Sequence, residues 1–144
     1  MSERKRFDRE LFDKYDKAAR EATTRVLKAK GYDVIEHPDR YAQDLIAYMP
    51  LDDYEFHVEC EVKRVWKELE FPYDSVQLPQ RKQKFFNGKT QFYIWNEPLT
   101  RAASFWDFDI ADLTPVEVPN KYMYKDEYFF QIPLEMVVFI DADA

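Results

Sequence analysis

The chain contains little cysteine and glycine and has no long apolar run. A single cysteine, Cys60, excludes an internal disulfide, and with only two histidines beside it a structural zinc site is not expected. Two glycines exclude the glycine-rich loops with which nucleotide-binding enzymes cradle phosphate. No apolar segment approaches the roughly 20 residues that span a bilayer, and the first residues lack a signal-peptide core. These absences predict a cytoplasmic protein that does not enter a membrane.

The 144 residues are 46% hydrophobic and 34% charged, which is typical of one globular domain spanning 1–144. The net charge of -7 is unevenly distributed. Residues 1–30 and 61–96 have an excess of basic side chains, whereas residues 31–60 and 97–144 are strongly acidic. Because charge acts locally, two basic segments can attract phosphate although the whole chain is negative. The charge balance therefore does not exclude a nucleic-acid partner.

The hydrophobic pattern predicts a mixed α/β fold. Apolar residues recur every three or four positions up to Gly31, as in an amphipathic helix, and shorter apolar or alternating runs predict strands. The expected elements are a helix over 7–30, strands over 32–36, 44–49 and 54–66, a polar loop over 67–75, a helix over 79–86, strands over 90–95 and 102–106, a hairpin over 122–132 around Lys125-Asp126, and a strand over 137–140. Residues 97–144 form a β-rich C-terminal extension in this interpretation.

Charged residues gather where two of these strands meet. In the strand over 54–66, alternation places Glu61 and Lys63 on the face opposite Cys60. Asp44 opens the preceding strand, and a turn at 50–53 lets the start of that strand lie beside the end of the next. Two carboxylates and an ammonium would then converge, and such a pair of carboxylates suits Mg²⁺. Lys63 would orient a water molecule or stabilise developing negative charge.

Asp44 followed by Glu61-Val62-Lys63, between a long helix and a helix–strand pair, resembles the PD-(D/E)XK nuclease superfamily, and within it the Holliday-junction-resolvase-like enzymes. The resemblance covers about residues 8–96. It implies a restriction-endonuclease-like αβββαβ core with a mixed sheet. It also implies Mg²⁺-dependent hydrolysis of DNA, with Mn²⁺ as a substitute, and a product that carries a 5′-phosphate. A branched or junction substrate and a homodimer are implied as well.

The resemblance also assigns roles to individual residues. Asp44 and Glu61 would hold the metal together with the main-chain carbonyl of Val62, and Lys63 would be catalytic. Glu21, near the end of the first helix, matches the family's helical glutamate and would support a second metal or the water network. A polar residue on the second helix often completes the site, and the candidates are Gln80, Gln83 and Lys84. The basic stretch Arg81-Lys82-Gln83-Lys84 would lie near the metal and could grip phosphate.

Several alternatives remain open at this point. The literal Pro38-Asp39 pair lies in a loop, so Asp39 is an alternative to Asp44, and Glu59 shares the face of Glu61 and is a further candidate ligand. The basic stretch at 81–84 is also consistent with an ordinary solvated helix face. The same sequence features allow a catalytically silent module of this fold that binds nucleic acid or assembles with proteins, or a protein-interaction module with an aromatic docking surface.

Overall fold

The computed structural model describes residues 9–118 and 127–142. The first helix, α1, is amphipathic and its buried stripe includes Ala19, Ala22 and Val26. Gly31 follows it with φ of 97°, a left-handed conformation that favours glycine, and the chain turns there into the first strand. In order, the elements are α1 (Arg9–Ala29), β1 (Asp33–Glu36), β2 (Leu45–Met49), β3 (Tyr54–Lys63), β4 (Ser75–Pro79), η1 (Gln80–Phe85), β5 (Thr90–Asn96), β6 (Arg101–Trp106), α2 (Asp107–Ile110), β7 (Val116–Val118), β8 (Glu127–Pro133), η2 (Leu134–Met136) and β9 (Val138–Asp141).

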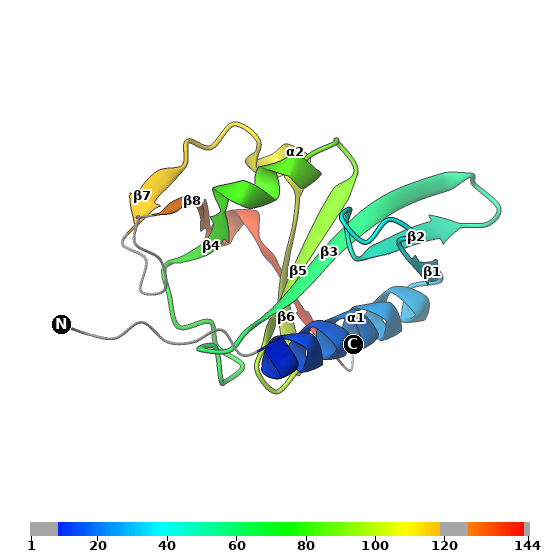
Figure 1. Cartoon of the computed structure of the whole chain (residues 1–144), viewed down its shortest axis with the longest axis horizontal. Helices are drawn as coiled ribbons and strands as arrows, with labels where there is room; N and C mark the ends of the chain where they lie inside the picture. The colour runs from blue at the N-terminus through cyan, green and yellow to red at the C-terminus, as the bar shows by residue number, and fades with distance from the viewer. Residues whose placement is uncertain (1–8, 119–126, 143–144) are drawn as a thin grey trace.

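The larger of two sheets has six strands in the order β1-β2-β3-β5-β6-β9 (Figure 1). Strands β3 and β5 are parallel, and the other neighbouring pairs are antiparallel. The parallel pair is joined by a crossover that contains β4 and η1. A three-stranded antiparallel sheet, in the order β4-β8-β7, accompanies it. The expected mixed α/β fold with a β-rich C-terminal part is confirmed.

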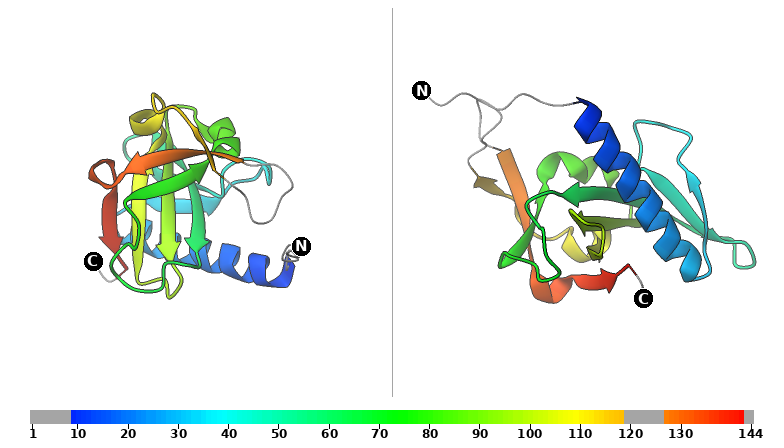
Figure 2. Two further views of the ribbon diagram at one scale, coloured as in Figure 1. Left: turned by 90° about the vertical axis from the view of Figure 1, so that its left-hand side faces the viewer. Right: turned by 90° about the horizontal axis from the view of Figure 1, so that it is seen from below.

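Helix α1 and the smaller sheet lie on different sides of the larger sheet (Figure 2), and each side buries a separate hydrophobic core. On one face, α1 packs against alternate residues of the strands, among them Val58 and Cys60 of β3. On the other face, Phe92 and Ile94 of β5 pack with the smaller sheet. On this second face, Glu59 of β3 contacts Lys82 of η1. Within the described residues, no helix is both long enough and apolar enough to cross a membrane.

The crossover differs from the expectation in two respects. Residues 75–79, partly expected as loop, form strand β4, and its inward residues Val76 and Leu78 are fully buried against β8. The expected α-helix is a 3-10 helix, η1, which starts directly after Pro79. The alternation of apolar residues before Pro79 was a usable signal, but β4 needs a partner 50 residues away to form. The expected turn at Lys125-Asp126 lies outside the described residues.

A buried aspartate connects η1 to β5. The Asp107 side chain accepts hydrogen bonds from the backbone amides of Asn87 (2.9 Å), Gly88 (2.8 Å) and Thr90 (3.2 Å). Asp107 is only 1% exposed, so these amides would lose their partner in a place that water does not reach easily. The carboxylate therefore holds the turn between η1 and β5.

Replacing Asp107 by alanine is expected to lower the free energy of unfolding by about 2 to 4 kcal/mol, since three backbone donors lose a charged acceptor. The measurement is urea denaturation followed by tryptophan fluorescence. Asp109→Ala is the matched control, because Asp109 lies in the same short helix but is exposed, and it should cost less than about 0.5 kcal/mol. Equal stability of the two variants would contradict the role of Asp107.

Candidate active site

The candidate site lies where β3 extends beyond the start of β2. The ladder between them runs from Met49 opposite Tyr54 to Leu45 opposite Val58, so residues 59–63 of β3 have no partner in β2. Asp44, directly before Leu45, turns its side chain onto this open edge. Its Oδ2 accepts a hydrogen bond of 3.0 Å from the backbone amide of Cys60. Asp44 therefore closes the ladder with its carboxylate.

Continuing the same register places Glu59, rather than Glu61, opposite Asp44. The Glu59 side chain is 9% exposed, and it points away from the α1 core that holds Cys60. Burial, and then the neighbouring Asp44 carboxylate, raise the pKa of Glu59 to about 8. Two carboxylates thus share one partly desolvated position at the open edge of β3.

A lysine from the crossover balances this pair of acids. The Nζ atom of Lys82 in η1 lies 2.5 Å from Oε2 of Glu59, and its side chain is 16% exposed. Burial acts to lower the pKa of Lys82, but the carboxylates of Glu59 and Glu61 outweigh it, and the pKa is raised. Lys82 is therefore a firmly charged ammonium held against the acidic pair.

Glu61 and Lys63 lie further along the same face of β3. The distance from Glu59 to Lys63 along the strand is about 13 Å, because each residue advances about 3.3 Å. The Nζ atom of Lys63 lies 5.4 Å from the ring centre of Tyr73. Burial lowers the pKa of Lys63, and the nearby Glu61 carboxylate opposes that effect. Glu61 and Lys63 therefore share one face of β3, as alternation predicts, but Glu61 lies two residues beyond the position opposite Asp44.

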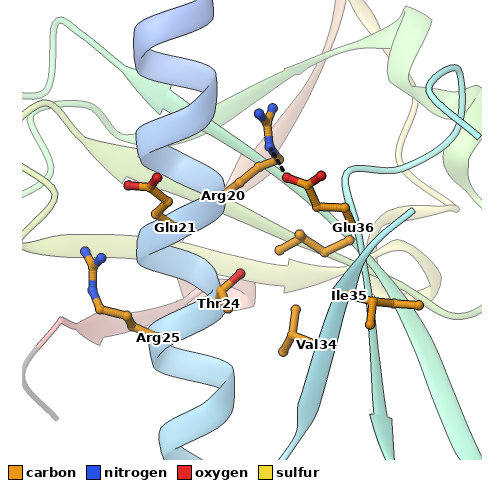
Figure 3. Close-up of a pocket in the computed structure, with 8 residues that line it drawn as sticks. Arg20, Glu21, Thr24, Arg25, Val34, Ile35 and Glu36 are labelled. Atoms are coloured by element: carbon orange, nitrogen blue, oxygen red, sulfur yellow. Dashed lines mark ion pairs between the residues drawn. The ribbon is translucent and has the colours of Figure 1, made fainter. Parts of the chain in front are cut away.

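The first helix presents a different acid to the site from the one expected. The Glu21 side chain is 58% exposed and lies 3.9 Å from Lys17, and in Figure 3 it projects away from the pair formed by Arg20 and Glu36. Asp16 instead forms an ion pair with Arg20. Burial and the Asp44 carboxylate raise the pKa of Asp16. The helical acid near Asp44 is therefore Asp16, one and a half turns before Glu21.

The loop before Asp44 completes the surroundings of the site. A cavity of about 280 Å³ is lined by residues of α1 and of this loop, including Asp16, Arg40, Asp39 and Asp44. Asp39 is exposed, and its Oδ1 accepts a hydrogen bond of 2.9 Å from the backbone amide of Tyr41. Asp39 therefore lies in the same cavity as Asp44, but its carboxylate stabilises the loop.

The other basic and amide residues expected on the second helix remain on the surface. Gln80, Arg81, Gln83 and Lys84 are exposed, and only Lys82 is directed toward the carboxylates. The ammonium of Lys84 lies 5.0 Å from the ring centre of Phe85. The short 3-10 helix therefore separates one inward lysine from several outward polar side chains.

The donor atoms at this edge fit a hard divalent cation. Among the described residues, no group of three or more His, Cys, Asp or Glu side chains is arranged to hold a metal, so the site offers a carboxylate pair. Mg²⁺ commonly takes one or two carboxylates and keeps several waters. The backbone amide of His57 donates a hydrogen bond to the carbonyl of Lys89, on the β5 side of the strand, whereas the amide of Cys60 donates to Asp44 on the other side. The backbone amides and carbonyls of the even-numbered residues of β3 therefore point to the open edge. The carbonyls of Cys60 and Val62 consequently lie on that edge too.

The position of Glu59 was available from the sequence, but not that of Lys82 or Asp16. Counting outward from a turn that pairs 49 with 54 gives 44 opposite 59, which identifies Glu59. Lys82 and Asp16 come from segments far along the chain, and no spacing rule connects them to Asp44. The helical pattern matched Glu21 because it lies near the end of α1, but the side of α1 that packs on the sheet carries Ala19, Ala22 and Val26, and the Glu21 side chain is 58% exposed.

Comparison with known proteins gives little further guidance. No protein-family description and no curated protein sequence matches the chain. Among solved structures, the chain is similar to D212, a nuclease from a fusselovirus, with a TM-score of 0.47 and 15% sequence identity. The alignment covers 94% of this chain and 89% of that chain.

Burial of Glu59 has a consequence for stability. The pKa of Glu59 is raised from 4.5 in the unfolded chain to about 8 in the fold, so the folded state keeps a proton that the unfolded state has released. This contribution is fully present below about pH 4.5 and is lost as the pH rises through about 8. Urea denaturation in EDTA between about pH 5 and pH 8 should therefore show a decrease in stability with pH.

Glu59→Gln is expected to remove this part of the pH dependence, because glutamine does not titrate. Glu61→Gln, on the same face of β3, is the matched control and should leave the slope between the two pH values unchanged. If wild-type protein and Glu59→Gln show the same change in unfolding free energy with pH, the raised pKa of Glu59 is wrong.

Proposed function

We propose that the protein is a Mg²⁺-dependent DNA endonuclease of the PD-(D/E)XK type. The observation that carries this proposal is the convergence of the Asp44 and Glu59 carboxylates at the open edge of β3, with the ammonium of Lys82 against them. An acid at the start of one hairpin strand and an acid on the next, between a long helix and a parallel strand, supports the same assignment. In this proposal Glu59 takes the position that the sequence motif assigned to Glu61.

Asp44 and Glu59 would hold the metal, and the carbonyl of Cys60 or Val62 is suitably placed to join them. A bound Mg²⁺ supplies an acidified water and neutralises the charge that grows on the phosphodiester in the transition state. Binding would also remove the repulsion between the two carboxylates, since the cation lies between them. Mn²⁺ prefers the same oxygen ligands and is expected to substitute.

Lys82 would act on the reacting groups as a charged hydrogen-bond donor. Its ammonium is held by Glu59 and lies in a partly buried position, where a charge interacts more strongly than in water. In the reaction, a water oxygen bonds to phosphorus, the bond from phosphorus to the 3′ oxygen breaks, and the leaving oxygen takes up a proton. The products would carry a 5′-phosphate and a 3′-hydroxyl. The Lys82 Nζ atom would orient the water or stabilise the phosphoryl oxygens.

Substrate form and assembly are further parts of the proposal. The resemblance to resolvase-like enzymes suggests a branched or junction DNA, and a homodimer that cuts symmetry-related strands. Exposed Arg81 and Lys84, beside the inward Lys82, would contact phosphates of the DNA backbone. Such contacts position the DNA but do not read its sequence.

A cleavage panel tests the proposal directly. Purified protein would be incubated with single-stranded DNA, linear duplex, supercoiled plasmid and a four-way junction, in Mg²⁺, Mn²⁺ or EDTA. The expected result is cleavage of at least one form in Mg²⁺ and Mn²⁺, and none in EDTA. A protein that cuts no form, and whose melting temperature does not rise with Mg²⁺, would be the catalytically silent module instead.

A further inference from the structure

Two exposed tyrosines, Tyr41 and Tyr73, lie on segments that adjoin the candidate site, and Tyr73 also contacts the ring of Phe71 with 5.9 Å between the ring centres. Tyr41 is 74% exposed and Tyr73 is 49% exposed, although a phenol ring normally buries much of its surface. Tyr41 lies in the loop before Asp44, and Tyr73 lies against Lys63 at the end of β3. Tyr73 therefore lies at the Lys63 end of the open segment of β3, residues 59–63, and Tyr41 belongs to the loop that leads into its Asp44 end.

A positively charged side chain lies over the ring of each of these tyrosines. The guanidinium carbon of Arg40 lies 4.9 Å from the ring centre of Tyr41, and its Nη2 donates to the Tyr41 hydroxyl at 2.8 Å. The ammonium of Lys63 lies 5.4 Å from the ring centre of Tyr73. Both tyrosine side chains keep a large exposed area beside the cation, and the cation brings positive charge to the place where a phosphate would lie beside a stacked base.

A third contact between a cation and a tyrosine ring lies at the end of β3, on the side of the sheet that α1 covers. The guanidinium carbon of Arg64, the residue after β3, lies 5.0 Å from the ring centre of Tyr15 in α1. Tyr15 is half-buried, so its ring offers less area for stacking than the other two. It nevertheless adds a positive charge to the Tyr73 end of the segment.

From these contacts we propose that the site takes an unpaired DNA strand, with one base stacked on Tyr41 and another on Tyr73 and the connecting backbone crossing the Asp44–Glu59 pair. An aromatic ring can stack on a base only when that base is not already stacked inside a duplex, so this arrangement selects single-stranded segments, including those at gaps or branch points. A DNA strand that follows the open segment, residues 59–63, would run along about 13 Å of β3, a length suited to a few nucleotides. This inference rests on the proposed nuclease function for the path of the strand.

The test measures binding rather than cleavage. A fluorescently labelled oligo(dT) and a labelled duplex of equal length would be titrated in EDTA, and anisotropy would give the dissociation constants. Tyr41→Leu and Tyr73→Leu are each expected to weaken oligo(dT) binding about five-fold or more, because a stacked base is lost. Duplex binding should change less than about two-fold. Tyr41→Phe and Tyr73→Phe keep the ring and should bind oligo(dT) within about two-fold of wild type.

Tyr128→Leu serves as the control for removing an exposed tyrosine elsewhere. Tyr128 is 47% exposed, but it lies in β8, and its hydroxyl contacts Glu117 of β7. This variant should bind both DNA forms as wild type does. The proposal is overturned if wild-type protein does not bind oligo(dT), if the leucine variants bind it unchanged, or if they lose duplex binding to the same extent.

The two proposals fail in different ways. If the protein binds oligo(dT) through Tyr41 and Tyr73 but cuts no DNA in Mg²⁺, base stacking on the two tyrosines is supported and the nuclease function is wrong. If DNA is cut in Mg²⁺ while the leucine variants bind and cut single strands as wild type does, the nuclease function is supported and base stacking on the two tyrosines is wrong.

Discussion

Asp44→Asn is expected to reduce Mg²⁺-dependent DNA cleavage by at least about 1,000-fold. Asparagine keeps an oxygen that accepts the hydrogen bond from the Cys60 amide, so the closure of the β2–β3 ladder is preserved. What is lost is the negative charge that would hold the cation beside Glu59. Without a correctly placed cation, neither the water nor the transition-state charge is stabilised, and electrostatic effects of this kind are large in partly buried sites.

The same substitution should separate activity from stability. In EDTA, Asp44→Asn is expected to be at least as stable as wild type, because it removes the repulsion that raises the pKa of Glu59. The increase in melting temperature produced by Mg²⁺ should disappear. Cleavage rates and melting curves, each with Mg²⁺ and with EDTA, provide the measurements.

Asp39→Asn is the matched control for Asp44→Asn. Asp39 lines the same cavity and also accepts a backbone hydrogen bond, from Tyr41, but its carboxylate is exposed. We expect this variant to keep activity within about three-fold of wild type. Loss of cleavage in Asp39→Asn with normal cleavage in Asp44→Asn would show that the loop acid, rather than the strand acid, binds the metal.

Lys82→Met is expected to produce the second large effect, a decrease in cleavage of about 100-fold or more. The loss of one well-placed charged donor typically costs this much in a site where charge develops. Removing the ammonium leaves the buried Glu59 carboxylate without its cation, so its pKa should rise further and a proton should compete more strongly with Mg²⁺. Part of the lost activity should therefore return at higher pH.

The Lys63→Met variant tests whether Lys63 or Lys82 takes part in cleavage. Lys63 is the residue that the sequence motif assigns to catalysis, but its ammonium lies over the Tyr73 ring. If Lys82 is the acting lysine, Lys63→Met should keep cleavage within about ten-fold of wild type. The opposite ranking, with Lys63→Met inactive and Lys82→Met active, would return the catalytic role to the Glu61–Lys63 pair. Circular dichroism of both variants establishes that each one is folded.

Much of the fold was readable from local patterns. The three- and four-residue spacing of apolar side chains predicted α1, and Gly31 marked its end, where the backbone has a positive φ. The β2–β3 hairpin and β5 followed from alternation and from aromatic and β-branched residues. These signals are strong because each reflects which side of an element is buried. Strand β4 was missed because its buried face depends on β8.

Part of the candidate site was also predictable from local patterns, and part was not. Local alternation in one hairpin was enough to identify Asp44 and to place Glu59, Glu61 and Lys63 on one face of β3, since side chains in a strand alternate strictly. Which carboxylate faces Asp44 depends on the register, and the register depends on the turn geometry.

The approach of Lys82 and Asp16 required the complete fold. Lys82 reaches Glu59 only because η1 is packed in the fold and Asp107 holds the turn that connects it to β5. Asp16 lies near Asp44 only because of the angle at which α1 crosses the sheet. Contacts between distant segments depend on packing angles and crossover geometry, and residue spacing along the chain contains no record of either.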